Sequence, residues 1–373
     1  MKENNRRLEA VSRRTALKVA GSGAVSLAGV GLISAAKNDD TVEITVSRNS
    51  EGPLKRKRVL QSWYNHLQQV RKVTDEVASE YNHRAGVISV GYVQGEDRIG
   101  GKRSFAVEVE VNPDEFDGSV PEQRDNVPVT VTESATSGPM PACYNYDDFS
   151  SVPGGVTLEG DGLGTSGFEV TDENDDSGML TANHLWGICA DSGGERAEQN
   201  GNFLGEVISH DTDADFAVVD DQSDSKSLND EIKQEGSVRW DISGWKTEDG
   251  IADLIESEED VRSMGVTTGL TKGPVKKKSQ RPYNPSCIDL EGEAVKLDID
   301  TGQGDSGGPT YTLEIFNGNQ YAVVINIVNL LDHSYGTENC YDGVASGDDR
   351  TLGRTQYGVA FHHLYDQHQI DLA

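Results

Sequence analysis

Ser306 stands in a glycine-rich stretch, residues 304–309, with one glycine two positions before it and two glycines directly after it. Glycine permits positive φ and lets the backbone approach a ligand closely. A nucleophilic serine needs that setting, because backbone N–H groups must face the oxyanion that forms during acyl transfer. The alternative is a glycine-rich surface turn. A base and an orienting acid elsewhere in the chain decide between the two interpretations.

A histidine and an aspartate with suitable surroundings precede this serine. His184 follows the apolar run 179–182 and one asparagine, where a predicted strand ends. Asp215 is followed by a bulky residue, an alanine and two aliphatic residues that enter a predicted buried strand. Histidine can take the serine proton, and a buried aspartate can fix the histidine tautomer and stabilise the imidazolium. The other acids of this segment are interpreted as solvated: Asp211, Asp213 and Asp220.

The chain order His184, Asp215, Ser306 resembles that of the trypsin/chymotrypsin-like serine proteases and differs from that of subtilisins and α/β-hydrolases. Two further segments, 164–168 and 264–275, resemble the bacterial streptogrisin-like branch of that family. The second of these has the pattern Gly-x-Thr-Thr-Gly-x-x-x-Gly-x-Val. The family resemblance therefore has specific motifs at several separate places in the chain.

The resemblance extends over about residues 140–373 and implies a mainly β fold of two antiparallel six-stranded barrels. Turn residues at intervals of about 8 to 12 positions agree with such barrels. We expect the first barrel at 143–235 and the second at 236–373, with the catalytic cleft between them. The resemblance also implies that the amides of Gly304 and Ser306 form the oxyanion hole. It requires neither a cofactor nor a metal.

The substrate pocket is predicted only from the alignment with the trypsin form. That alignment assigns the following residues to the pocket: Asp300, Thr301, Gln303, Ile327 and Asn329. An aspartate at the pocket base implies cleavage after Arg or Lys. Two departures leave this open, because Gly302 replaces a cysteine and Ile327 and Asn329 replace a Ser-x-Gly pattern. Asp305 has a charged partner in the family, but its partner in this chain is left open.

Peptide or protein substrates follow from the resemblance, and the sequence predicts a serine endopeptidase. Two alternatives remain from other classes of protein. The altered strand after the serine would suit an inactive relative that binds peptides in its cleft. A serine esterase would use the same nucleophile, base and acid on a different bond.

The charge is distributed unevenly along the chain. Residues 1–137 contain 19 Lys and Arg against 19 Asp and Glu, whereas residues 138–373 contain 14 against 44. The whole net charge of −30 therefore belongs to the protease-like part. Such a charge opposes binding to nucleic acids and to anionic membranes. It resembles the acidic surfaces of proteins from extreme halophiles, so we interpret the chain as a salt-adapted protein of the secreted haloarchaeal type.

The N-terminal segment, residues 1–36, is interpreted as a twin-arginine export signal. Arg13 and Arg14 precede a mildly apolar run rich in glycine and alanine, with a candidate cleavage site at 34–36. We therefore expect a secreted protein without stable membrane insertion after cleavage; retention of the signal as an anchor is the alternative.

Export makes the four cysteines candidates for disulfides. We predict Cys143–Cys189 and Cys287–Cys340, out of three conceivable pairings. No C-x-x-C spacing exists, which disfavours a metal site.

Residues 40–135 are predicted to form a small α+β module, joined to the protease part by a linker at 136–142. Apolar residues at spacings of three and four predict a helix over 59–81, and strands are expected at 87–93, 105–111 and 127–131. The module is interpreted as a pro-region that binds the protease part, with a permanent accessory domain as the alternative.

Two charged runs are interpreted as solvated. The basic run 55–58 is expected at the start of the module's helix, and the acidic run 248–260 is expected to be an exposed loop.

Overall fold

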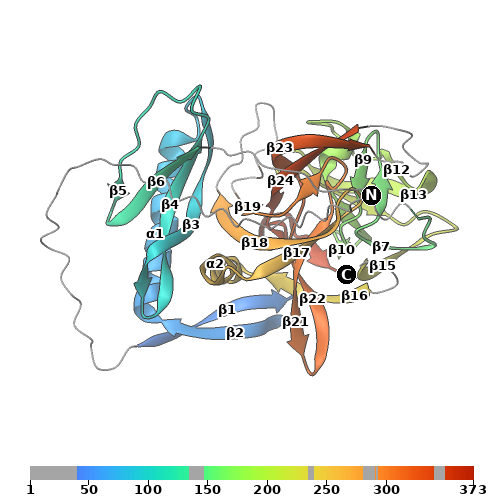
Figure 1. The fold of residues 1–373 in the computed structure, drawn as a ribbon. Coiled ribbons are helices and arrows are strands. Elements are labelled where there is room, and N and C mark those ends of the chain that lie inside the picture. The colour runs from blue at the N-terminus through green and yellow to red at the C-terminus, as the bar shows by residue number, and fades with distance from the viewer. Residues whose placement is uncertain (1–39, 134–146, 234–238, 280–289, 291–292, 340–348) are drawn as a thin grey trace, which may run out of the picture. The chain divides into compact units, whose positions relative to one another are not determined.

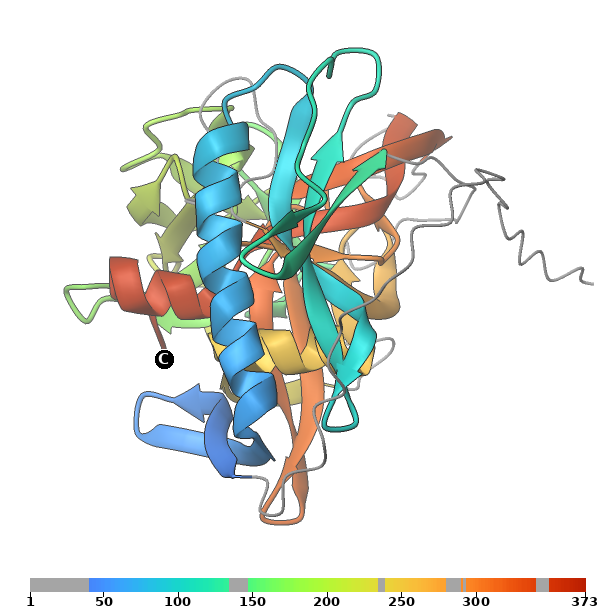
Figure 2. The same cartoon turned by 90° about the vertical axis from the view of Figure 1, so that its left-hand side faces the viewer.

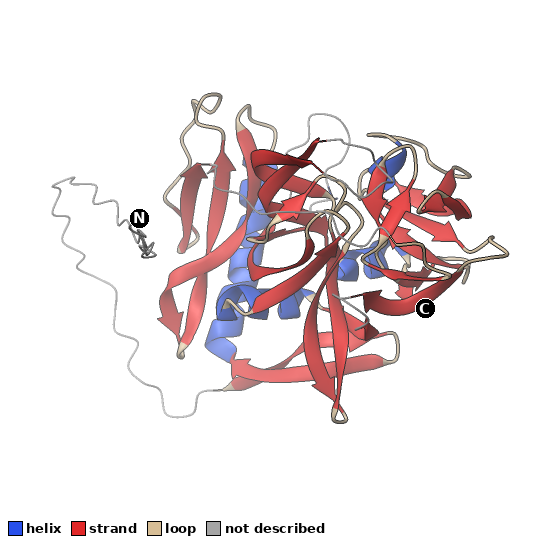
Figure 3. Ribbon diagram, turned by 45° about the vertical axis from the view of Figure 1, so that its right-hand side comes forward, coloured by secondary structure: helices blue, strands red, loops and turns tan. Residues whose placement is uncertain are grey.

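The computed structural model describes residues 40–133, 147–233, 239–279, 290, 293–339 and 349–373 (Figure 1). The prediction of a mainly β fold is confirmed, since strands dominate this part of the chain and helices are few (Figure 3). The predicted export signal and linker lie outside the described residues. No helix in the described ranges has both the length and the hydropathy needed to cross a membrane.

Residues Asp40–Ala373 form one compact unit. Its N-terminal part contains β1 (Thr41–Asn49), β2 (Gly52–Leu60), α1 (Gln61–Tyr81), β3 (Val87–Ile99), β4 (Lys102–Val111), β5 (Gln123–Arg124) and β6 (Val127–Glu133). The predicted helix and three strands are all present. The basic run 55–58, however, lies within β2 and not at the helix start. It was misread because the run itself contains only basic residues, and it becomes a strand through backbone pairing with β1.

The remaining described strands belong to two sheets. Eight form one sheet: β8 (Thr157–Glu159), β9 (Leu163–Thr165), β10 (Glu169–Thr171), β11 (Ser177–Thr181), β12 (Arg196–Gln199), β13 (Asn202–Asp211), β14 (Phe216–Asp220) and β25 (Asp371–Leu372). A short 3-10 helix, η1 (Asn183–Trp186), follows β11, and α3 (Phe361–His368) precedes β25.

The larger sheet joins strands β1 to β6 to eleven further strands of the described chain. These are β7 (Ser151–Gly154), β15 (Ser227–Lys233), β16 (Arg239–Lys246), β17 (Asp260–Gly265), β18 (Gly269–Ser279), β19 (Ala294–Leu297), β20 (Thr301–Gly302), β21 (Pro309–Phe316), β22 (Asn319–Ile327), β23 (Leu330–Asn339) and β24 (Asp349–Val359). β7 and β15 pair with each other in this sheet, although they precede the predicted barrel boundary at 235.

The N-terminal module shares its sheet and its core with the second half of the chain. β1 pairs with β16, and β3 pairs with β18, so backbone hydrogen bonds run across the junction at both places. α1 packs on β3 and β4 (Figure 2). One hydrophobic cluster contains Trp63 and Leu67 of α1 together with Val275 and Leu297 of β18 and β19. The module is therefore not a separate body in the structure.

The acidic run 248–260 is not an exposed loop, and that prediction was wrong. It contains α2 (Glu248–Ser257), a helix that buries Ile251, Leu254 and Ile255. The hydroxyl of Thr247 caps the helix by accepting a hydrogen bond from the amide of Gly250, and two acids stand in its first turn. Acids there are favoured by the helix dipole. The expectation depended on the many acids of this run and did not take into account that its apolar residues recur with helical spacing and form one face.

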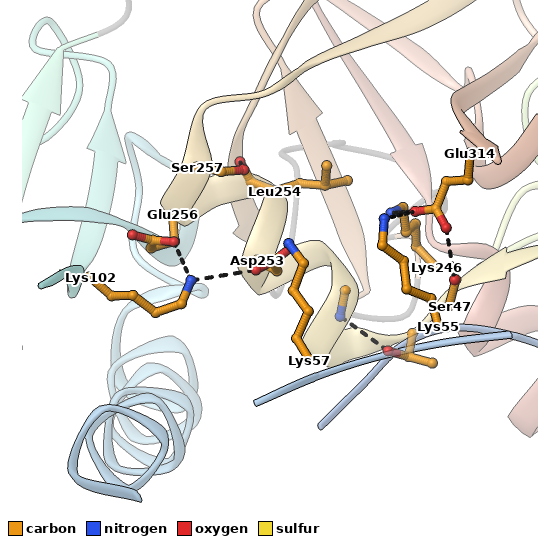
Figure 4. Close-up of polar contacts among 12 residues, drawn as sticks. Ser47, Lys55, Lys57, Lys102, Lys246, Asp253, Leu254, Glu256, Ser257 and Glu314 are labelled. Atoms are coloured by element: carbon orange, nitrogen blue, oxygen red, sulfur yellow. Dashed lines mark hydrogen bonds and ion pairs between the residues drawn. The ribbon is translucent and has the colours of Figure 1, made fainter. Parts of the chain in front are cut away.

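Lysines of the N-terminal module and carboxylates of the second half meet around α2 (Figure 4). Lys57 contacts Asp253, and Lys102 pairs with Glu256 at 2.5 Å. In a second group, Glu314 accepts from Lys55 at 3.2 Å and from Lys246 at 2.5 Å, and the Ser47 hydroxyl donates to it at 3.1 Å. The two halves are thus joined by charge as well as by packing.

The most deeply buried of these ion pairs involves Lys277 of β18, whose side chain is 0% exposed. Its ammonium donates to Ser89 at 2.8 Å and to Glu108 at 3.1 Å, and it lies 3.7 Å from Glu110. Glu110 also accepts from Lys296 at 2.6 Å. Removing one partner of a buried ion pair leaves an uncompensated charge in a medium of low dielectric constant.

We predict that Glu110→Gln lowers the free energy of unfolding by about 3 kcal/mol, because it leaves two lysines short of a buried carboxylate. Urea unfolding at high salt measures this. The matched control is Glu43→Gln, which removes an exposed pair with Arg56 and should cost at most about 1 kcal/mol. Equal effects of the two substitutions would contradict a buried ionic junction.

Candidate active site

Three strand ends bring His184, Asp215 and Ser306 together. His184 lies in η1, directly after β11, and Asp215 immediately precedes β14. β11 and β14 are antiparallel neighbours, so the end of the first strand meets the start of the second. Ser306 comes from the larger sheet, in the loop between β20 and β21. The three residues therefore lie where the two sheets meet.

The side chains form a continuous hydrogen-bonded row. The Nδ1 of His184 lies 2.7 Å from Oδ2 of Asp215, and its Nε2 lies 2.8 Å from Oγ of Ser306. The backbone amide of His184 also donates to Oδ1 of Asp215 at 2.9 Å. This is the arrangement in which imidazole can take the serine proton while the carboxylate orients the ring.

Asp215 is held from both sheets. Its side chain is 1% exposed, and its backbone has φ = 55°, an unusual value for a residue other than glycine. Asn329, between β22 and β23, donates through Nδ2 to the Asp215 carbonyl at 2.7 Å and to its Oδ2 at 3.1 Å. The Asn329 oxygen accepts in turn from the amide of Val359 at 2.8 Å. Strained backbone that neighbouring groups hold in place is a common feature of functional sites.

The pKa of His184 is raised above its usual value. Burial opposes the charged imidazolium, but attraction to the Asp215 carboxylate and the hydrogen bond to it outweigh that effect. Although its ring is enclosed by these neighbours, 21% of the side chain remains accessible to solvent. The ring can therefore exchange protons with a bound molecule.

The loop before the serine has the geometry of an oxyanion hole. Gly304 has φ = 104°, and a Cβ there would lie 2.7 Å from both the Thr267 hydroxyl and the Arg350 guanidinium, so only glycine fits. Within the described chain, the amides of Gly304 and Ser306 have no hydrogen-bond acceptor. Two unpaired donors beside a serine hydroxyl can stabilise a developing oxyanion.

Among the residues that the structure describes, Asp305 finds its partners in the Thr-Thr segment and at Gly302, and none of them is charged. Its carboxylate accepts from the amides of Thr267, Thr268 and Gly302 and from the Thr268 hydroxyl, at 2.6–3.1 Å. Burial raises the pKa of Asp305, and these hydrogen bonds oppose that rise. The Gly-x-Thr-Thr-Gly pattern therefore positions residues 303–308, the candidate nucleophile loop. The sequence motif alone did not indicate this role.

Three of the predicted pocket residues have other roles. Asn329 is buried against Asp215, and Ile327 is in the hydrophobic core. Thr301 is also buried, with its hydroxyl 3.4 Å from the Asp305 carboxylate. The alignment took these assignments from the order of residues, whereas the direction of each side chain depends on strand register, so the pocket roles of the three stay predictions.

The other two assignments stay predictions. The Gln303 side chain is exposed, beside the nucleophile loop. Asp300 is partly buried, and burial raises its pKa while Arg354 lowers it and Asp298 raises it.

The cysteine predictions are tested at one position only. Cys189 is disulfide-bonded, whereas Cys143, Cys287 and Cys340 lie outside the described residues, so the pairings stay predictions. Within the described ranges, His, Cys, Asp and Glu side chains form no group of three that could hold a metal ion.

No protein-family model and no curated protein matches this chain. Solved structures to which it is similar include Thermobifida fusca protease A, Nocardiopsis protease and Cellulomonas bogoriensis chymotrypsin. Each is 18% identical with a TM-score of 0.40, and each match covers 60% of this chain and 98% of the other. The functional proposal therefore depends on the geometry of the site and not on these similarities.

We predict that His184 titrates above pH 6.5 in the Ser306→Ala variant, since Asp215 stabilises the imidazolium. In Ser306→Ala/Asp215→Asn the attraction is lost and burial remains, so the pKa should fall. NMR titration of the imidazole at constant salt measures both values. The same pKa in the two variants would show that Asp215 does not control the ring.

Proposed function

We propose that the protein is a serine endopeptidase that cleaves peptide bonds through an acyl-enzyme. One observation carries the proposal: His184 bridges the buried carboxylate of Asp215 and the hydroxyl of Ser306 at 2.7 and 2.8 Å. Serine, histidine and aspartate with these contacts are a recurrent solution for acyl transfer. The two unpaired amides of the nucleophile loop add the electrostatic component that this reaction requires.

The residues have distinct roles in the proposed reaction. His184 Nε2 takes the proton as Ser306 Oγ attacks the carbonyl carbon, and the amides of Gly304 and Ser306 donate to the resulting oxyanion. The imidazolium then gives its proton to the leaving amine, and the peptide C–N bond breaks. Water, deprotonated by the same histidine, hydrolyses the ester and releases Ser306. Asp215 keeps its charge throughout and holds the ring in one tautomer.

An exported, salt-adapted enzyme with a permanent N-terminal module is the second part of the proposal. The paired arginines before the apolar run support export, and the acidic excess after residue 137 supports adaptation to high salt. The shared core and the buried Lys277 pairs favour an accessory role over a pro-region that is discarded. Loss of the module would expose apolar surface and leave Lys277 without its carboxylates.

We predict that the wild-type protein is labelled by a fluorophosphonate probe at high salt and that Ser306→Ala is not. His184→Ala should lower kcat by several orders of magnitude, because the serine hydroxyl loses its base. The absence of label on a folded wild type would contradict an enzyme and favour an inactive peptide binder. A peptide-library digest beside an ester substrate separates a protease from an esterase, since hydrolysis of the ester alone would indicate an esterase. The cleaved peptide bonds would show whether Asp300 selects basic residues.

We also predict that activity falls when salt is reduced from molar concentration to about 0.1 M, because the net charge of −30 is then less screened. Circular dichroism and fluorophosphonate labelling on the same samples follow unfolding and loss of the site together. Neutralising several exposed acids of residues 138–373 should restore part of the activity at low salt. Full activity at both salt concentrations would contradict salt adaptation.

A further inference from the structure

The carbonyl of Gln303 is held from the side away from the nucleophile. The Thr267 hydroxyl donates to it at 2.7 Å, and Nη1 of Arg350 donates at a longer 3.5 Å. Thr267 follows β17 and is fully buried, and Arg350 lies in β24, which pairs with β20 just before the loop. Two separate segments of the chain therefore bring donors to one carbonyl.

This carbonyl belongs to the same peptide unit as the amide of Gly304. In a planar trans peptide the C=O and the N–H point in opposite directions. Fixing the Gln303 oxygen towards Thr267 and Arg350 therefore directs the Gly304 N–H to the opposite side, where no described group accepts from it. If this peptide turned over, one of the two oxyanion donors would be lost.

Arg350 decides which way round the peptide lies. A threonine hydroxyl can donate or accept, so Thr267 alone would tolerate either the C=O or the N–H opposite it. A guanidinium has donors only, and an N–H facing it would be repelled. Nη1 of Arg350 also lies only 2.7 Å from the place where a Gly304 Cβ would stand, so its charge is directly beside this peptide.

Burial of the Arg350 side chain has a cost in stability. The residue is 5% exposed, and its Nε has no hydrogen-bond partner. Burying a polar group whose hydrogen bonds are incomplete lowers stability. Its position beside the nucleophile loop, in a protein with an excess of acids, indicates a role in the site and not in the fold.

We propose that Thr267 and Arg350 are positioning residues that keep the Gln303–Gly304 peptide in the orientation needed for the oxyanion hole. The inference deepens the proposed serine endopeptidase and rests on it. The same Thr-Thr segment holds Asp305 through backbone amides and the Thr268 hydroxyl. It therefore anchors the loop on both sides of Gly304.

The first test replaces the hydroxyl of Thr267. Thr267→Val should lower kcat by about tenfold to 100-fold, as expected for a weakened oxyanion donor, with little change in KM. Thr267→Ser keeps the donor and should stay within about threefold of wild type. The control is Thr312→Val in β21, where the threonine is buried and its hydroxyl has no partner, so kcat should not change.

Two readouts separate positioning from a structural defect. The acid limb of the pH profile of kcat should be the same in Thr267→Val, Thr267→Ser and Thr312→Val, because none of them changes His184 or Asp215. The inhibition constant of a peptide aldehyde, whose tetrahedral adduct places an oxyanion in the hole, should rise by the same factor as kcat falls. Equal losses in Thr267→Ser and Thr267→Val, or a rise in KM alone, would overturn the proposal.

The second test uses the opposite effects on stability and on kcat that we expect when Arg350 is replaced. Arg350→Met removes a buried guanidinium whose Nε has no hydrogen-bond partner, so stability against urea should stay the same or increase, while kcat falls. A loss of both stability and kcat would show a structural role and overturn the assignment of Arg350.

A crystal structure of Ser306→Ala/Thr267→Val/Arg350→Met is independent of activity and should show the Gln303–Gly304 peptide turned over or in two orientations. An unchanged peptide would overturn the positioning role of both residues. Failure of the proposed function has a different signature, since wild type would then take no fluorophosphonate label or would hydrolyse esters alone.

Discussion

The buried carboxylate of Asp215 is the constraint on which the site depends. A charge that is 1% exposed must be compensated, and both sheets supply the groups that do so. His184 donates from the smaller sheet through its amide and its ring, and Asn329 donates from the chain between β22 and β23 of the larger sheet. Satisfying one acid therefore fixes the relative position of the two sheets and, with it, the contact between His184 and Ser306.

The nucleophile loop also depends on a buried acid whose hydrogen bonds are satisfied by its surroundings. Asp305 is a second buried acid, and the amides of Thr267, Thr268 and Gly302 satisfy it without a counter-charge. The chain around Gly304 is consequently tied down by many short hydrogen bonds, and its own amide is left unpaired. Rigid surroundings of unpaired donors are what electrostatic stabilisation of a transition state requires.

Three places show what could and what could not be predicted from the sequence. The hydrogen-bonded row of His184, Asp215 and Ser306 could be anticipated because each member lies in a short motif whose chemistry is local. α2 was missed because the many acids of the run 248–260 hide an apolar face formed by Ile251, Leu254 and Ile255. The contact of Asn329 with Asp215 was not predicted, because it joins residues more than a hundred positions apart. No local pattern reports such a contact.

The residue types alone determined the candidate chemistry, the order of nucleophile, base and acid, and the acidic excess that the fold must tolerate. Only the tertiary structure decided that the N-terminal module shares its core with the second half, and which groups compensate each buried charge. The physical reason is that types and short-range spacing are properties of the chain. Burial and hydrogen-bond partners, in contrast, arise only when β1, β3, β16 and β18 pair across long separations.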